Sequence, residues 1–180
     1  MAFCPLGSQE AALADSLGQG HRDNRLLAAP SSEILANLDP DLRQVSIARG
    51  AVIFEPGAPL DTIYFPQSGL ISLVIVTRNG DTVEAATIGR EGAVGLHGAL
   101  GKRLSFTRAT AQVAGHFSVI GAARFERVVN GSGQVQKLIA QYTELLWAEA
   151  QQIAACNAVH DASSRLARLA PAERRSRRHQ

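Results

Sequence analysis

The chain has 180 residues, enough for one domain with an appendage, and its 46% hydrophobic content is ordinary for a protein with a buried core. The longest apolar stretch, Leu70–Val76, is far too short to cross a bilayer, and the first twenty residues lack the basic start of a signal peptide. We therefore expect no membrane contact and a cytoplasmic location. Two cysteines exclude a disulfide framework and an iron–sulfur cluster.

The formal net charge of +2 is divided unevenly along the chain. From Arg165 onward there are six arginines and one acid, Glu173, whereas the preceding residues hold 12 basic and 15 acidic side chains, a net of −3. A nucleic-acid-binding domain usually carries its positive charge on a folded face. The main body of this chain is mildly acidic and does not fit that class.

The first elements in chain order are short. Residues 1–22 are rich in Gly, Ala and Ser without periodicity, which predicts a loose N-terminal arm. Ser31-Ser32-Glu33 then opens a short helix that runs to about Leu38, because serine is a favoured N-cap.

From Val45 to Ile120 the sequence changes to short β-rich runs separated by turn residues. Many short strands spaced by turns predict a sandwich, a jelly roll or a closed barrel. The Asn79-Gly80 pair predicts a hairpin with a two-residue type I′ turn, which requires positive φ at both residues. The expected strands are 45–47, 51–54, 62–65, 70–77, 82–88, 107–113 and 116–120.

A glycine-rich loop, Gly89–Gly101, interrupts these strands. Its glycines are too many for a regular strand and suit a tight loop around a short helical turn, in which backbone N–H groups can point at a ligand.

The pattern turns helical after Ile120. Ala122–Val129 predicts a short helix, and the segment from Gln134 to about Val159 predicts one long helix without Pro or Gly. A heptad reading of this long helix gives two apolar stripes, so we expect it to pack both on its own barrel and on a second chain. A helix packed only on its own domain is the alternative. The expected dimer interface comprises Leu138, Tyr142, Leu145, Glu149, Gln152 and Cys156.

Four local motifs resemble the effector domain of the Crp/Fnr family of bacterial transcription regulators. They are Asn24–Ala29, Ile53–Gly57, Ile63–Gly69 and Ile88–Gly92, and the collinear resemblance extends to about Arg168. It implies a mainly β fold with flanking helices, a jelly-roll (double-stranded β-helix) barrel over residues 23–132, followed by a long dimerisation helix over residues 133–162.

The resemblance also implies a ligand pocket. In the family's cyclic-nucleotide binders a Gly-Glu pair engages the sugar and a following arginine neutralises the phosphate. Here Leu96 stands where the glutamate would be, and a hydroxyl residue lies near the arginine position. Neither can replace a carboxylate or a guanidinium, so we expect a small-molecule effector of unknown identity other than cAMP or cGMP. The expected cassette comprises Gly95, Leu96, His97, Gly98, Ser105, Thr107 and Arg108.

Other chemistry is less well supported by the sequence. Cys156 and His160 are spaced for one helical face, but two ligands alone do not make a metal site. An enzyme on a cupin-like barrel would need several metal ligands on its strands, and the strands offer only His116. We therefore expect no catalytic residues, no metal and no cofactor.

The C-terminal segment departs from the family pattern. Residues 157–168 resemble the junction to a winged helix-turn-helix, but the sequence from Leu169 does not continue it. We expect residues 163–180 to form an aberrant basic tail and the chain to be a truncated or frameshifted regulator that touches DNA only non-specifically. The alternative is a stand-alone ligand-binding or adaptor module that pairs with another regulator.

Overall fold

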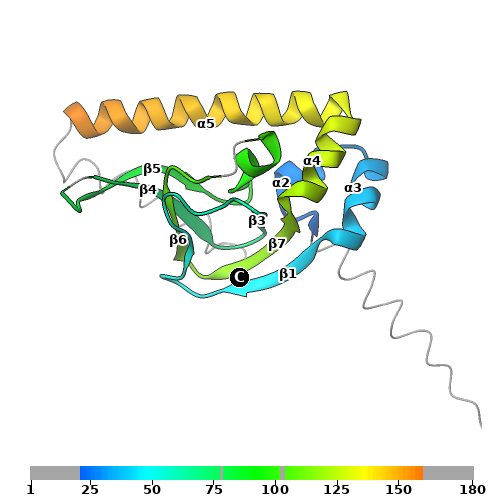
Figure 1. Cartoon of the computed structure of the whole chain (residues 1–180), viewed down its shortest axis with the longest axis horizontal. Coiled ribbons are helices and arrows are strands. Elements are labelled where there is room, and N and C mark those ends of the chain that lie inside the picture. Colours follow the sequence, from blue (N-terminus) through cyan, green and yellow to red (C-terminus); the bar gives the residue numbers. More distant parts are fainter. Residues whose placement is uncertain (1–20, 78, 102–103, 160–180) are drawn as a thin grey trace, which may run out of the picture.

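The computed structural model of the chain describes residues 21–77, 79–101 and 104–159. The expected N-terminal arm, apart from its last two residues, and the expected basic tail lie outside the described residues, as does His160. Within the described part, two antiparallel β-sheets followed by helices confirm the mainly β class and the jelly-roll barrel (Figure 1).

All seven expected strands are present, with ends that move by a residue or two. One sheet has the order β1-β7-β3 and the other the order β2-β6-β4-β5, with every pairing antiparallel. The strands are β1 (Arg43–Ile47), β2 (Val52–Phe54), β3 (Thr62–Pro66), β4 (Leu70–Val76), β5 (Thr82–Ile88), β6 (Arg108–Val113) and β7 (Gly115–Gly121).

The β4–β5 hairpin is confirmed, but its turn differs from the expected type. The Thr77 N–H donates to the Asp81 carbonyl at 2.8 Å and the Gly80 N–H donates to the Thr77 carbonyl at 3.0 Å. Only Gly80 has a positive φ, at 87°, whereas Asn79 does not. These bonds close a three-residue loop that ends in a left-handed glycine, which is the alternative hairpin geometry that this pair of residues also permits.

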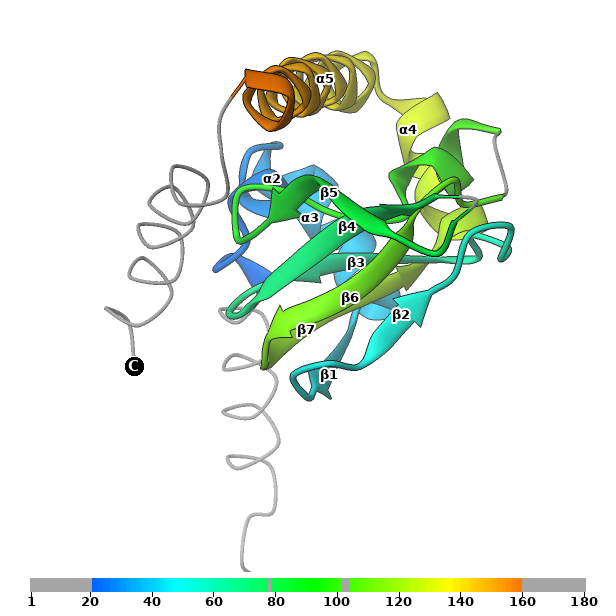
Figure 2. The same cartoon turned by 90° about the vertical axis from the view of Figure 1, so that its left-hand side faces the viewer.

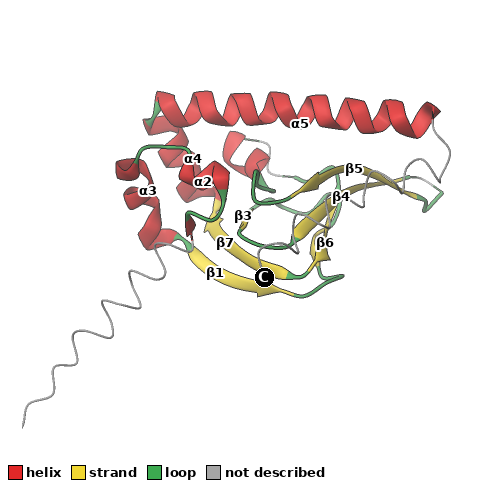
Figure 3. Cartoon of the chain, turned by 180° about the vertical axis from the view of Figure 1, so that it is seen from behind, coloured by secondary structure: helices red, strands yellow, loops and turns green. Residues whose placement is uncertain are grey.

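The helices gather at one end of the barrel, except for the last one, which runs along its length (Figures 1 and 3). None of the helices among the described residues is long and apolar enough to span a bilayer. They are α2 (Arg25–Ala28), α3 (Ser32–Leu38), α4 (Ala122–Gly131) and α5 (Gly133–Val159), with short 3-10 turns η1 (Asp39–Asp41) and η2 (Leu96–Leu100).

Two groups of buried side chains stabilise this arrangement. The first joins the helical end to β3 and β7, and in it the Phe65 and Phe125 rings pack with centroids 5.6 Å apart. The second fills the barrel interior around Ile71, Ala109 and Phe117, each of which is fully buried. Figure 2 looks along α5, which lies over the barrel on the side of β5.

Asn24 fixes the entry segment to the barrel. Its side chain is fully buried, and its Oδ1 caps α2 by accepting from the Leu27 N–H at 3.0 Å. Its Nδ2 donates to the carbonyl of Pro66 at 2.8 Å and to that of Gly92 at 2.9 Å. One side chain therefore connects α2, the end of β3 and the glycine-rich loop.

Candidate functional site

A cavity of about 130 Å³ lies between the barrel, the glycine-rich loop and α5. Strands β2 and β4 contribute to its walls, as do the loop before β6 and one turn of α5. Its lining residues are Phe54, Leu60, Leu73, Ala93, Val94, Gly95, Leu96, His97, Leu100, Ser105, Phe106, Thr107, Tyr142, Thr143 and Leu146.

The glycine-rich loop is pinned against β3. The backbone N–H groups of Tyr64 and Val94 each donate to the other residue's carbonyl, at 3.0 and 2.9 Å. Gly95 then turns with φ 87°, and a Cβ there would lie 2.5 Å from the Thr62 carbonyl oxygen. Gly98 is equally restricted, because a Cβ would collide with the carbonyl oxygen of Leu60. The close approach of two backbones explains why glycine occupies both positions.

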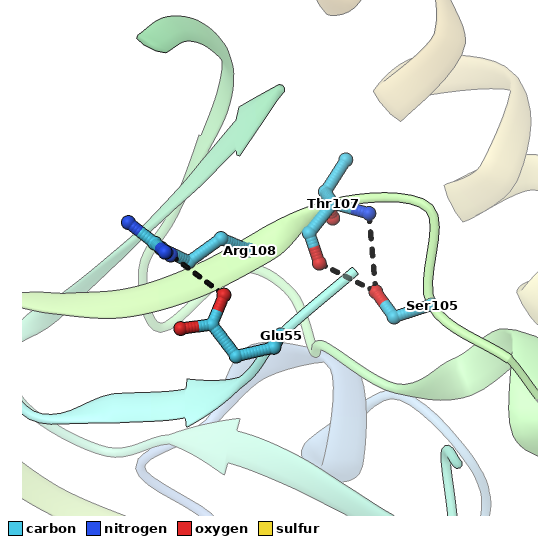
Figure 4. A network of polar contacts seen from close by, with 4 residues as sticks. All are labelled: Glu55, Ser105, Thr107 and Arg108. Carbon is cyan, nitrogen blue, oxygen red and sulfur yellow. Dashed lines mark hydrogen bonds and ion pairs between the residues drawn. The ribbon is translucent and has the colours of Figure 1, made fainter. Parts of the chain in front are cut away.

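The loop before β6 forms a small turn at the cavity. The Ser105 hydroxyl donates to the Thr107 carbonyl at 2.6 Å and accepts from the Thr107 N–H at 3.2 Å (Figure 4). Ser105 is buried, whereas Phe106 between the two is 75% exposed and lies at the opening of the cavity.

Arg108 lies on the other face of the strand. Side chains alternate along β6, so Ala109 is buried in the barrel while the Arg108 Nε donates to Glu55 Oε2 at 2.7 Å (Figure 4). Both partners are partly exposed. The guanidinium is held by this ion pair outside the cavity lining.

Helix α5 closes the cavity through Tyr142. The Tyr142 hydroxyl donates to the Ala93 carbonyl and accepts from the Ala93 N–H, each at 3.1 Å. Its ring packs over Gly92, where a Cβ would lie only 2.8 Å from ring carbons Cε2 and Cζ. Burial raises the pKa of this phenol, so it remains protonated as a hydrogen-bond donor.

Three glutamates, Glu84, Glu91 and Glu149, lie near one another beside α5. The Glu149 residue is exposed, yet partial desolvation of its carboxyl raises its pKa above its ordinary value, and the nearby carboxylates of Glu91 and Glu84 raise it further. Glu91 and Glu84 are already hydrogen-bonded, to the Gly89 N–H and to the Ser72 hydroxyl respectively. Among the described residues, no cluster of three potential metal ligands occurs.

The expected cassette is largely brought together. Gly95, Leu96, His97, Ser105 and Thr107 line the cavity, whereas Gly98 and Arg108 do not. The cavity also uses Thr143 and Leu146, which the cassette prediction did not include. Their signal in the sequence is their helical spacing from Ile139, which puts them on the stripe that faces the barrel.

The residues expected at a dimer interface divide between two environments. Leu138 and Tyr142 pack against the core of their own domain. Leu145 is 70% exposed, Glu149 and Gln152 are exposed, and Cys156 is intermediate. The exposed members of the expected interface thus lie on one flank of α5. Trp147, which is 66% exposed, lies on another flank.

A family model and several solved structures match the β-barrel region of this chain. Residues 44–132 match the family model of the cyclic nucleotide-binding domain. No curated protein is similar enough in sequence to count as a match.

Solved structures share the fold at low sequence identity. The c-di-GMP-responsive global regulator CLP of Xanthomonas campestris is 15% identical, with a TM-score of 0.65 over 77% of this chain and 70% of its own. The sensor domain of the transcriptional regulator DNR of Pseudomonas aeruginosa is 17% identical, with a TM-score of 0.61 over 78% and 93%. A guanosine-bound regulatory subunit of a cAMP-independent protein kinase A of Trypanosoma cruzi is 14% identical, with a TM-score of 0.65 over 85% of this chain and 54% of its own.

Proposed function

We propose that the chain is the effector-sensing and dimerising part of a Crp/Fnr-like transcription regulator, a proposal supported by the match of residues 44–132 to the cyclic nucleotide-binding domain. The observation that carries the proposal is the double use of α5. One turn of this helix supplies Tyr142, Thr143 and Leu146 to the cavity wall, and the neighbouring Leu145 side chain is 70% exposed. A ligand in the cavity contacts the same helix that would bind a second chain.

The proposed effector is not cAMP or cGMP. Leu96 offers no acceptor for a ribose hydroxyl, and Arg108 is paired with Glu55 rather than aimed at a phosphate. The structures similar to this chain are described with different ligands, c-di-GMP in one case and guanosine in another, so the fold alone does not select a ligand.

The proposed DNA contact is non-specific. Six arginines from Arg165 onward can neutralise phosphates, but phosphate contacts alone carry no base readout. Such binding would be equal on promoter and random DNA and would weaken steeply as salt rises.

The dimer is tested by sedimentation of the wild type and of Leu145→Asp. Burying one leucine contributes about 1.5–3 kcal/mol, and a two-fold interface uses each residue twice. We therefore expect the dissociation constant to rise by about 100-fold or more. Circular dichroism should be unchanged, because Leu145 is exposed within its own chain.

The matched control is Gln151→Asp, which adds the same charge to an exposed position of α5. Six residues on, it projects roughly 120° away from Leu145 around the helix axis, so the dimer should persist. A wild-type chain that sediments as a monomer at tens of micromolar would refute the dimer. Equal dissociation by both variants would show that Leu145 does not mark the interface.

A further inference from the structure

The walls of the cavity are mainly hydrocarbon. Of its lining residues, nine have apolar side chains, and most of these are buried or half-buried. Within the described part of the chain, the lining contains no Lys, Arg, Asp or Glu, and His97 is its one basic side chain. The apolar members are Phe54, Leu60, Leu73, Ala93, Val94, Leu96, Leu100, Phe106 and Leu146.

Three of the four hydroxyl groups that line the cavity are already used as donors. Ser105 donates to the Thr107 carbonyl at 2.6 Å, Tyr142 to the Ala93 carbonyl at 3.1 Å, and Thr143 to the Ile139 carbonyl at 2.8 Å. A hydroxyl whose hydrogen is already donated can only accept a further hydrogen bond. These three groups therefore offer lone pairs to a ligand and no hydrogen.

An anion would find few donors in this lining, chiefly the His97 ring and the Thr107 hydroxyl. A carboxylate or phosphate needs donors or cations when it leaves water, and burying it without them costs far more than burying a neutral group. Arg108 directly follows the lining residue Thr107. Its guanidinium is held on the outer face of β6 by the ion pair with Glu55.

The volume limits the size of the ligand. An apolar cavity of about 150 Å³ holds one benzene molecule, and this cavity has about 130 Å³. A ligand of about one ring fits without displacing α5, whereas a nucleotide would require the helix to move away from Gly92 and Ala93.

From these observations we propose that the cavity binds an uncharged, mainly apolar molecule of about one ring that donates one hydrogen bond, with the Thr143 hydroxyl as its acceptor. The inference rests on the proposed sensing function and adds the ligand class to it. Thr143 is favoured over Ser105 and Tyr142, because each of those oxygens also accepts a backbone N–H. The hydrogen bond would then end on α5.

The test is a series of three probes of similar shape: benzene, phenol and benzoate, with cAMP as a fourth. Binding to the full chain is measured by calorimetry and by amide chemical shifts of Val94, Thr143 and Leu146. We expect phenol to bind about fivefold more tightly than benzene, the effect of one hydrogen bond. Benzoate and cAMP should bind more weakly than either.

Two variants assign the site. Thr143→Val keeps the shape and removes the acceptor, so it should lower phenol affinity to that of benzene and leave benzene unchanged. Leu146→Phe fills the cavity and should weaken both probes. If Leu146→Phe fails to fold by circular dichroism, Thr143→Val decides alone.

The outcomes separate the two proposals. If benzoate or cAMP binds more tightly than phenol at these amides, the ligand class is wrong while effector sensing stands. A phenol preference that survives Thr143→Val overturns the assigned acceptor. If no probe binds and the wild type is also a monomer, the proposed function fails together with the inference.

Discussion

The contact of Tyr142 with Gly92 and Ala93 gives the sharpest test of how α5 is held. In Tyr142→Phe the ring remains, but the buried Ala93 N–H and carbonyl both lose their partner. An unpaired buried backbone group costs about 1–3 kcal/mol. We expect the free energy of unfolding to fall by about 2 kcal/mol. This is the lower end of the range for two unpaired groups, because phenylalanine has no hydroxyl that must be desolvated.

A double-mutant cycle measures the coupling between the Tyr142 side chain and Gly92. In the wild type, Gly92→Ala places a Cβ 2.8 Å from two carbons of the Tyr142 ring, and overpacking of this kind costs about 1–3 kcal/mol. In a Tyr142→Ala background the ring is absent and the same substitution should cost nearly nothing. The coupling energy should therefore be about 2 kcal/mol.

Urea denaturation followed by far-ultraviolet circular dichroism gives the four free energies of unfolding. Gly131→Ala is the matched control, because Gly131 lies in α4 with nothing within 4 Å of the added Cβ. It should be neutral or stabilising. If Gly92→Ala costs the same with and without the Tyr142 ring, the packing argument is wrong.

Three further predictions concern polar side chains of the described residues. Asn24→Ala should destabilise by about 3 kcal/mol, because it removes a helix cap and unpairs two carbonyls, and Asn24→Asp, which keeps the cap but turns a carboxyl oxygen toward both carbonyls, should lose at least as much at pH 7. The pKa of Glu149 is raised from 4.5 by burial and by its neighbouring carboxylates, so its ionisation destabilises the fold as the pH rises above 4.5. Urea titrations should therefore find Glu149→Gln more stable than the wild type at pH 7 and equal to it well below pH 4.5. Burial lowers the pKa of His21 from 6.5, against the opposing charge of Asp39, so stability should fall as the pH drops below 6.5. In the wild type the His21 Nδ1 lies 2.6 Å from the Ser118 hydroxyl. His21→Asn, which keeps a polar group there but does not titrate, should show a smaller fall.

The fold was predictable because its signals are local. Short β-rich runs bounded by turn residues predict all seven strands, and the match of residues 44–132 to the cyclic nucleotide-binding domain agrees with the fold that the resemblance implied. The turn at Asn79–Gly80 was not predicted correctly, because the same pair suits a two-residue type I′ turn and a three-residue loop with a left-handed glycine. The choice between them depends on cross-strand register rather than on the pair itself.

The site was less predictable, because its geometry depends on single-residue register and on long-range contacts. Thr107 lines the cavity and Arg108 does not, since one step along a strand reverses the face. On α5, both stripes are apolar, so the pattern alone did not indicate which of them faces the barrel. The answer lies in the bond between Tyr142 and Ala93, which are 49 residues apart.

The turn of α5 from Tyr142 to Leu146 both holds the helix on the barrel and forms a wall of the cavity. A ligand shifts a conformational equilibrium only by its difference in affinity between the two states. A ligand that contacts Thr143 and Leu146 has that difference, because it loses both contacts when the helix leaves. At a hundred times its dissociation constant it stabilises the docked helix by about 2.7 kcal/mol, which exceeds the roughly 2 kcal/mol assigned to the two Tyr142 hydrogen bonds. Under the proposed function, a ligand in this cavity would therefore add to the docking of α5 about as much as the two Tyr142 hydrogen bonds do, beside the core contacts of Val135 and Ile139.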